Sequence, residues 1–223
     1  MPLGIRRMIA GSPALATAAL IGGLAPGVVQ AQGPYSISGN SVAIYNLAGE
    51  ITVEQGTGAD VVVEVTRGGD DAADLRIETG RIGDANTLRV IYPSSRVVAS
   101  FLRSGQQTKV RVRDNGTFSD RGNDRGSSVS ISSDGNGMEA WAHLTIRVPA
   151  GKKLSVYLAV GRIDATNLDG DIRLDTHSAS VTATTVRGSL DVDVGSGSVD
   201  VSDVTGHLRI DTGSGGVRLL RGG

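Results

Sequence analysis

The chain has 223 residues, of which 32 are glycine, 3% are aromatic and none is cysteine. Without cysteine it forms no disulfide bond and offers no thiolate to a metal ion. Its formal net charge of -1 lacks the basic excess of nucleic-acid-binding proteins, so nucleic acid is not an expected partner.

Residues 1–31 have the pattern of a signal peptide. Arg6 and Arg7 form a short basic region, and a weakly apolar stretch (ALATAALIGGLAPGVV) runs to a small-residue site that ends at Ala31. We expect cleavage after Ala31 by the general secretory route; the paired arginines leave twin-arginine export as the alternative. The stretch is shorter and less apolar than the ~20 residues of a spanning helix, so no membrane span is expected in the mature chain. The predicted location is the periplasm or the cell surface.

The next part of the chain is predicted to consist of strands. Residues 42–53 (VAIYNLAGEITV) alternate apolar and polar residues around Gly49, which is strand spacing with a glycine turn. Further strand-like runs lie at 61–65, 75–78, 87–92, 109–113, 129–132 and 144–148. Residues 94–140 are rich in Gly, Ser, Asp and Arg, and we expect a long irregular loop there. Its aspartates Asp114, Asp120 and Asp124 lack the spacing of an EF-hand calcium loop, so a solvated loop is expected.

The C-terminal third consists of repeated units of equal length. Its three complete units are RIDATNLDGDIRLDTHSA (unit 1, 162–179), SVTATTVRGSLDVDVGSG (unit 2, 180–197) and SVDVSDVTGHLRIDTGSG (unit 3, 198–215), and a fourth begins at Gly216. Apolar residues recur in the same columns with alternating spacing, and Gly170, Gly188 and Gly206 recur as a turn glycine. Residues 42–53 match 163–174 column by column, with Gly49 in the place of Gly170. Each unit therefore predicts a strand, a glycine turn, a second strand and a Gly/Ser turn.

One such unit cannot bury its apolar face alone, whereas stacked units can. The predicted fold is all-β: a single-domain parallel β-solenoid, or β-helix-like stack, over residues 32–223. Regular 18-residue rungs span 160–221, and the irregular section 94–140 is inserted between the first turn and these rungs. Right-handed coiling is expected. A left-handed hexapeptide helix fits less well, because the apolar columns do not have hexapeptide spacing.

The tetrad Asp211-Thr212-Gly213-Ser214 looks like the active-site loop of an aspartic protease. However, Asp175, Asp193 and Asp211 occupy the same position in the three units, and Glu54 falls in the same column of the upstream match. A protease pairs two aspartates across a cleft, whereas these recur along one edge of a stack. We therefore expect outward-pointing, solvated turn residues without a catalytic role. Stacked like charges repel one another, so a calcium ladder along the three aspartates is the alternative.

The sequence offers no other constellation for catalysis or metal binding. The three histidines, His143, His177 and His207, fall in different columns, so no metal pair is indicated. Ser196 and Ser214 sit in repeated turns and not in a nucleophile elbow with His and Asp partners. We expect no enzyme activity, no catalytic residue and no cofactor.

Residues 144–154 (LTIRVPAGKKL) lead into 160–164 (VGRID) and the glycine-punctuated units. Together with residues 42–53, this pattern resembles a bacterial adhesin-like family of exported domains of unknown function, from about Ser36 onward. The resemblance implies an exported, non-catalytic envelope or surface protein that binds an unidentified protein or envelope component through a repetitive surface. Alternatives are a carbohydrate-active or carbohydrate-binding β-helix protein and a calcium-stabilised structural module. An open end of the stack would also expose strand edges, so end-to-end self-association is a further expectation.

Overall fold

The computed structural model describes residues 30–119 and 126–220, and in these ranges the chain is all-β, as predicted. The predicted signal region up to residue 29, and Asp120 and Asp124 of the predicted loop, lie outside the described residues. The predicted cleavage point after Ala31 lies within the first strand. Within the described ranges, the one helical segment is the 3-10 turn η1 (Ala72–Asp74), and no helix is long and apolar enough to cross a membrane. The strands are β1 (Gln30–Ile37), β2 (Ser41–Gln55), β3 (Val61–Gly68), β4 (Arg76–Ile82), β5 (Ala85–Ile91), β6 (Arg96–Val98), β7 (Gln107–Val112), β8 (Ser127–Ser132), β9 (Met138–Glu139), β10 (Trp141–Val148), β11 (Lys152–Ser196), β12 (Val199–Ser214) and β13 (Val217–Leu220).

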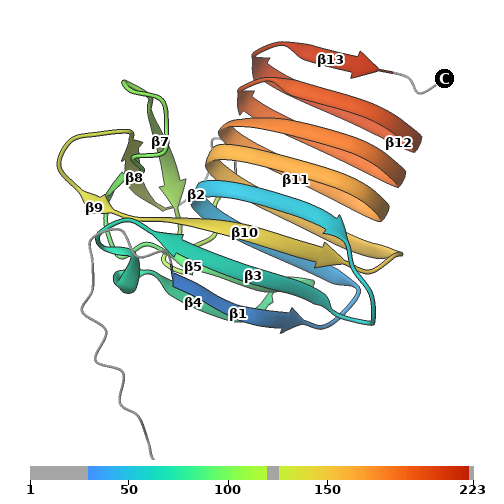
Figure 1. Ribbon diagram of the computed structural model, residues 1–223, viewed down its shortest axis with the longest axis horizontal. Coiled ribbons are helices and arrows are strands. Elements are labelled where there is room, and N and C mark those ends of the chain that lie inside the picture. The colour runs from blue at the N-terminus through green and yellow to red at the C-terminus, as the bar shows by residue number, and fades with distance from the viewer. Residues whose placement is uncertain (1–29, 120–125, 221–223) are drawn as a thin grey trace, which may run out of the picture.

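These strands form two mixed sheets (Figure 1). The larger has the order β1-β3-β10-β2-β11-β12-β13, with β5 attached to β2 and β4 to β5; the smaller has the order β7-β8-β6-β9. In the larger sheet the pairs β10–β2, β2–β11, β11–β12 and β12–β13 are parallel. The pairs β1–β3, β3–β10 and β4–β5 of this sheet, and β7–β8 of the smaller sheet, are antiparallel. The prediction of a wholly parallel arrangement is thus wrong for these four pairs. In β4–β5 the reason is local, because a two-residue turn at Gly83-Asp84 permits only an antiparallel hairpin.

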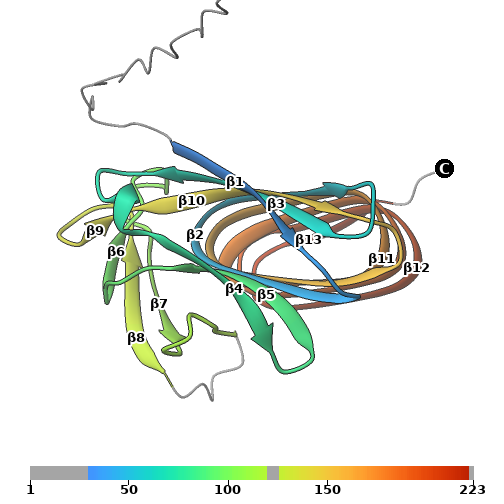
Figure 2. The same cartoon turned by 90° about the horizontal axis from the view of Figure 1, so that it is seen from below.

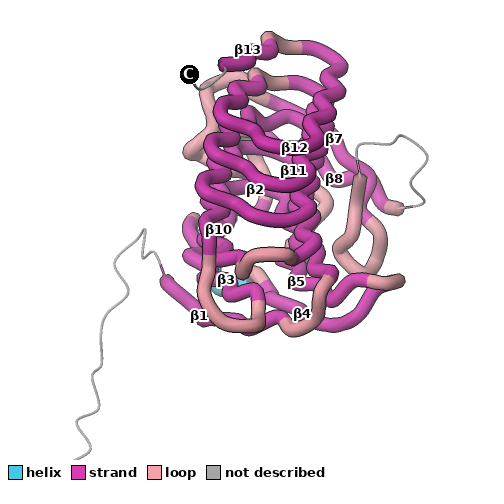
Figure 3. The backbone as a smooth tube through the Cα atoms, turned by 90° about the vertical axis from the view of Figure 1, so that its right-hand side faces the viewer, coloured by secondary structure: helices cyan, strands magenta, loops and turns pink. Residues whose placement is uncertain are grey.

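The C-terminal strands pair in register with the sequence repeat. β11 pairs with β12 from Val181 beside Val199 to Ser196 beside Ser214, an offset of one complete unit. β12 pairs with β13 at the same offset, with Val199 beside Val217. Figures 1 and 3 show these segments as successive layers. Equivalent side chains of neighbouring units therefore lie about 4.8 Å apart, the spacing of paired strands.

The register of β2 differs from the predicted alignment. β2 pairs with β11 so that Gly49 lies beside Gly161 and not in the column of Gly170. Glu54 correspondingly lies beside Thr166 and outside the aspartate column. The predicted and observed alignments differ by half of a unit, which is the separation of Gly161 and Gly170 in the sequence. Both halves of a unit consist of a short alternating strand and a small-residue corner, so the sequence pattern fits either half.

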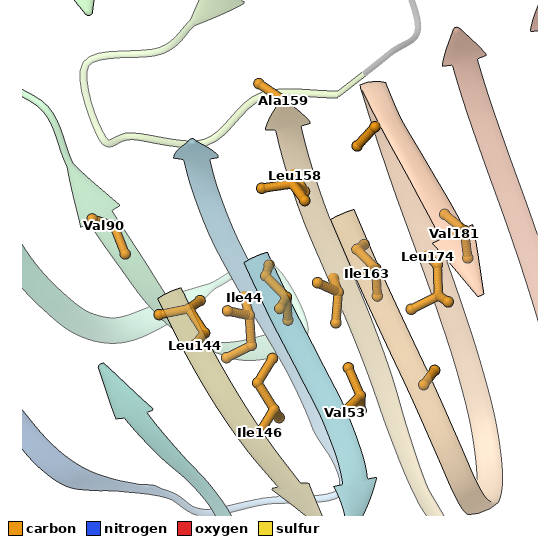
Figure 4. Packing of buried hydrophobic residues seen from close by; sticks show 14 of the residues in the cluster. Ile44, Val53, Val90, Leu144, Ile146, Leu158, Ala159, Ile163, Leu174 and Val181 are labelled. Carbon is orange, nitrogen blue, oxygen red and sulfur yellow. The ribbon is translucent and has the colours of Figure 1, made fainter. Parts of the chain in front are cut away.

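The apolar side chains that alternate along the strands form one continuous core. Ile44, Leu154, Ile163, Leu174 and Val181 are at most marginally accessible, and Figure 4 shows several of them pointing toward one another between the layers. At the N-terminal end of the stack the core is closed, because β1, β3 and the residues after η1 add buried side chains of their own. These are Ile37, Val61, Val63, Val65 and Leu75.

Section 94–140 differs from its predicted irregular form. It contains β6, β7, β8 and β9, which make up the smaller sheet beside the stack (Figure 2). Val97, Val110, Val129 and Ile131 are buried and belong to the common core. These strands are two to six residues long and their apolar residues are few, so the polar composition around them dominates the sequence pattern.

Candidate functional site

Two of the three aspartates of the predicted column, Asp175 and Asp193, lie beside Arg173, and the third, Asp211, pairs with Arg209 at 3.7 Å. Asp193 lies beside Asp211 in the β11–β12 register. Arg173 Nη2 lies 2.9 Å from Asp175 Oδ2 and 3.2 Å from Asp193 Oδ2, and its Nη1 lies 2.8 Å from Asp191 Oδ2. Burial lowers the pKa of Arg173, but the hydrogen bond and charge of Asp175 and the charge of Asp191 outweigh it and raise the pKa overall. The guanidinium therefore stays charged and offsets the repulsion among the carboxylates.

The aspartate column is not uniformly solvated, contrary to the prediction. The exposed fraction of the side chain is 3% for Asp175, 18% for Asp193 and 63% for Asp211. Tyr157 occupies the same column one unit before Asp175. Its ring stacks on the ring of Tyr45 at a centroid distance of 4.4 Å. The buried ring of Phe118, just after β7, packs edge-on against Tyr45 at 5.9 Å. The segment that follows β7 thus packs over the beginning of this column, whereas its end at Asp211 lies in solvent.

The arrangement of the aspartates bears on two interpretations of the tetrad 211–214, as a protease-like loop and as part of a calcium ladder. The aspartates follow one another along the stack, and the tetrad's Asp211 is the most exposed of the three. The cation that bridges Asp175 and Asp193 is the side chain of Arg173. Among the described residues, no group of three or more His, Asp or Glu side chains is arranged to hold a metal ion. A calcium ladder along these aspartates is still the alternative. Arg173 already compensates part of the carboxylate charge that calcium would neutralise.

The predicted turn glycines lie at two corners of the stack. Gly170, Gly188 and Gly206 have φ values of +150°, +105° and +127°, and a Cβ at Gly188 or Gly206 would clash with the carbonyl oxygen of the glycine one unit earlier. Gly49 has φ +155° and belongs to the opposite corner, where a Cβ would meet the Ala142 carbonyl. Close stacking of backbone therefore requires glycine at both corners.

A broad, open concave surface lies along the corner that contains Gly161. We call it the serine groove, and its volume is about 730 Å³. Its floor consists of Gly161, Ala179 and Gly197, which are flanked by hydroxyl side chains from successive units. Two hydroxyl pairs bridge the units: Ser198 Oγ donates to Ser180 Oγ at 3.2 Å, and the Oγ atoms of Ser196 and Ser214 are 3.0 Å apart.

The opposite wall of the serine groove is the segment 101–106, between β6 and β7. It contributes Phe101, Leu102 and the exposed Arg103. On the other side Arg162 pairs with Glu50 at 3.2 Å, with about half of each side chain exposed. Arg162 also pairs with Asp164 at 2.8 Å, so this side carries both signs of charge, while Arg103 places a positive charge on the opposite wall.

An aromatic cluster supports this wall from behind. Phe101 lies 5.8 Å from the ring of Trp141 and 5.5 Å from that of His143. His143 Nδ1 accepts a hydrogen bond of 2.9 Å from the backbone N–H of Glu50. Burial lowers the pKa of His143, which agrees with its role as a neutral acceptor. The histidine thus joins the wall to the Glu50 side of the groove.

Sequence reasoning missed both Arg173 and the serine groove. A signal for the first exists, because Arg173, Asp191 and Arg209 form a column of alternating sign beside the aspartates. The groove has no comparable signal, since its wall and its floor come from segments far apart in the sequence. His177 and His207 lie on the units outside this groove, consistent with their separate columns.

Comparisons with known proteins do not assign a family. No protein-family model matches the chain, and no curated protein matches its sequence. Two crystal structures are similar in part. A candidate cell adhesion protein from Clostridium sporogenes is 8% identical with a TM-score of 0.47, over 88% of this chain and 99% of that one. A candidate adhesin from Bacteroides fragilis is 10% identical with a TM-score of 0.27, over 87% and 97%.

Proposed function

We propose that the protein is an exported, non-catalytic binding protein of the bacterial envelope or cell surface, with an adhesin-like role. The fold proposed for it is a β-solenoid: a right-handed coil of parallel 18-residue turns, closed at one end by antiparallel strands. It presents the serine groove to an extended segment of another envelope component. The signal-like residues 1–31 and the resemblance of the repeat support export and envelope binding.

The observation that carries the proposal is the serine groove itself. A regular stack alone has flat polar faces, which suit only broad and weak contacts. Here the segment 101–106 stands against one corner and turns part of such a face into a concave site. Hydroxyl groups repeat along its floor at the spacing of the units, so the site offers equivalent hydrogen-bonding groups to successive parts of an extended ligand.

The non-catalytic part of the proposal rests on the polar groups of the groove. Its serine hydroxyls pair with one another, and the carboxylate of Glu50 pairs with Arg162. The nearby His143 uses Nδ1 to accept a backbone hydrogen bond. These contacts hold the side chains in place, and each serine oxygen keeps lone pairs that can accept a hydrogen bond from a ligand, so the groove is suited to binding. The aromatic Phe101 and the hydroxyl rows favour a glycan as the second candidate ligand.

The test is co-sedimentation of the protein, purified after export from a bacterial host, with isolated envelope fractions. Ser196→Trp fills the groove and Arg103→Glu reverses the charge on its wall, and each variant should reduce the bound fraction several-fold. Asp169→Trp and Lys109→Glu are the matched controls, because both side chains are exposed and lie outside the groove. Soluble cell-wall glycan fragments added as competitors separate a glycan ligand from a protein ligand.

The proposal has two clear ways to fail. Equal binding by all four variants would remove the groove as the binding site. Loss of sugar polymer with release of fragments during incubation would contradict a non-catalytic role. The mass of the exported protein tests the signal prediction, since cleavage after Ala31 leaves Gln32 at the N-terminus.

A further inference from the structure

The chain contains two Asn-Gly pairs, Asn115-Gly116 and Asn136-Gly137, and both lie in turns beside the smaller sheet. Asparagine followed by glycine is prone to deamidation, because glycine has no side chain to keep the asparagine amide away from its backbone nitrogen. In this reaction the glycine nitrogen attacks the carbonyl carbon of the asparagine side chain. The local geometry of each turn therefore determines which of the two pairs can react.

Asn115 is held away from this reaction. Its Oδ1 accepts hydrogen bonds from the backbone N–H of Thr117 at 3.1 Å and from the Thr117 hydroxyl at 2.8 Å. The backbone N–H of Gly116, which would have to attack, donates to the Arg113 carbonyl at 2.8 Å, and Gly116 is buried. Arg89 Nη1 also donates to the backbone carbonyl of Asn115 at 2.7 Å. Attack at Asn115 would require several of these bonds to break together.

Asn136 has no such restraint. It lies in the exposed bend 133–137, which projects from the side of the stack between β8 and β9 (Figure 1). Its side chain makes no hydrogen bond with the described residues. A Cβ at Gly137 would lie 2.9 Å from the Arg96 carbonyl oxygen, so the packing of this segment against β6 requires glycine. The fold thus keeps the glycine that leaves Asn136 open to attack.

The same bend contacts the wall of the serine groove. The backbone N–H of Ser133 donates to the Gln106 carbonyl at 3.0 Å, and the backbone N–H of Gly105 donates to Ser133 Oγ at 3.0 Å. Gly105 and Gln106 both line the groove, as does Arg103. A change of charge or of chain length in the bend therefore takes place next to this wall.

We infer that Asn136 is a site of spontaneous deamidation in the folded protein, whereas Asn115 is protected. The Gly137 nitrogen loses its proton and forms a bond to Cγ of Asn136, the bond from Cγ to the amide nitrogen breaks, and ammonia leaves. Water then opens the resulting cyclic succinimide at either of its two carbonyl carbons, which gives aspartate or isoaspartate. The net change replaces NH2 with OH, and water is the single co-reactant.

Both products alter the bend. The new carboxyl group is ionised at neutral pH, so the bend gains a negative charge. Isoaspartate also lengthens the backbone by one carbon atom. The inference does not depend on the proposed function, and it places a covalent modification beside the wall of the serine groove.

The test is incubation of the full chain in mildly alkaline buffer, followed by tryptic digestion and mass spectrometry. The two pairs fall in separate tryptic peptides, 114–121 and 126–147, each of which contains a single asparagine. Peptide 126–147 should gain the mass difference between OH and NH2 about tenfold faster than peptide 114–121, because reaction at Asn115 must first break its hydrogen bonds. It should separate into two products by chromatography, and the Asn136→Asp chain supplies the standard for the aspartate form.

Two controls connect the reaction to this residue and to the fold. Asn136→Gln should leave peptide 126–147 unchanged, because the longer side chain would have to close a larger and less favoured ring. In guanidinium chloride both wild-type peptides should react at similar rates, since the hydrogen bonds that hold Asn115 are lost. A peptide 126–147 that stays unchanged in the folded chain, under conditions in which the denatured chain reacts, would overturn the inference. So would equal rates for the two peptides in the folded chain, because Asn115 would then not be protected.

Discussion

Arg173 Nη2 lies 2.9 Å from Asp175 Oδ2, and the carboxylate of this pair is almost completely buried. The same guanidinium reaches Asp191 and Asp193 in the next unit. A repeat that stacks acidic side chains therefore contains its own counter-ion. Removing one partner of a buried ion pair leaves a charge without compensation, which is costly in a medium that water does not reach.

The buried aspartate should matter for stability, and the exposed one should not. Asp175→Asn removes the charge nearest to Arg173 and should lower the free energy of unfolding by about 2 kcal/mol. Asp211→Asn should change it by less than about 0.5 kcal/mol, because that side chain lies mostly in solvent. Urea unfolding followed by circular dichroism measures both. Equal effects of the two variants would contradict the gradient of burial along the column.

Calcium should not stabilise the protein. Arg173 already bridges Asp175 and Asp193, and Arg209 pairs with Asp211, so the unfolding temperature should be the same in calcium and in chelator. Differential scanning calorimetry of the full chain measures this. A rise of several degrees in calcium would make the column a metal site and return a functional role to the tetrad.

Gly188 should be irreplaceable at its corner. A Cβ there meets the carbonyl oxygen of Gly170, and φ is +105°, so Gly188→Val should cost at least about 3 kcal/mol or prevent folding. The control is Gly216→Ala, since a Cβ at Gly216 has no atom within 4 Å. Soluble yield and urea unfolding compare the two. A stable Gly188→Val protein would show that the layers can separate at this corner.

A charge placed inside an apolar column should be severely destabilising. Val201→Asp introduces an unpaired carboxylate at a buried inward position, with an expected loss of about 3–5 kcal/mol. Thr205→Asp, at an exposed corner position of the same strand, should be nearly neutral. The difference in urea midpoint between the two variants tests the inward assignment of Val201.

Stability should fall in mild acid partly through His143. The fold lowers the pKa of this imidazole, so the unfolded chain takes up the proton first as the pH falls. The contribution of His143 is therefore present above its ordinary pKa of about 6.5 and is lost below it. His143→Asn should flatten the decrease in unfolding free energy between neutral and mildly acidic pH relative to the wild-type chain. A pH profile of the variant that is identical to that of the wild type would contradict the assignment.

The sequence predicts those parts of the structure that repeat. Alternation identifies Val181 and Val199 as inward residues, and the repeat length places Gly188 and Gly206 in one column. The repeat does not determine the register of β2. Each unit has two similar halves, so Gly49 can be aligned with either of two positions half a unit apart. The sequence also does not predict tertiary contacts between segments that do not repeat. The burial of Asp175 and the groove wall at Phe101 depend on where the smaller sheet lies, which no local pattern records.

The constant offset between β11, β12 and β13 gives this chain an adjustable length. Because neighbouring layers are related by one complete unit, a duplicated or deleted unit leaves every remaining column continuous. Each added unit would lengthen the stack by one strand spacing, about 4.8 Å. An insertion of any other size would shift the columns and set polar side chains against the core. Tandem duplication of whole units would therefore change the length of the stack in fixed steps while the closed end stays as it is.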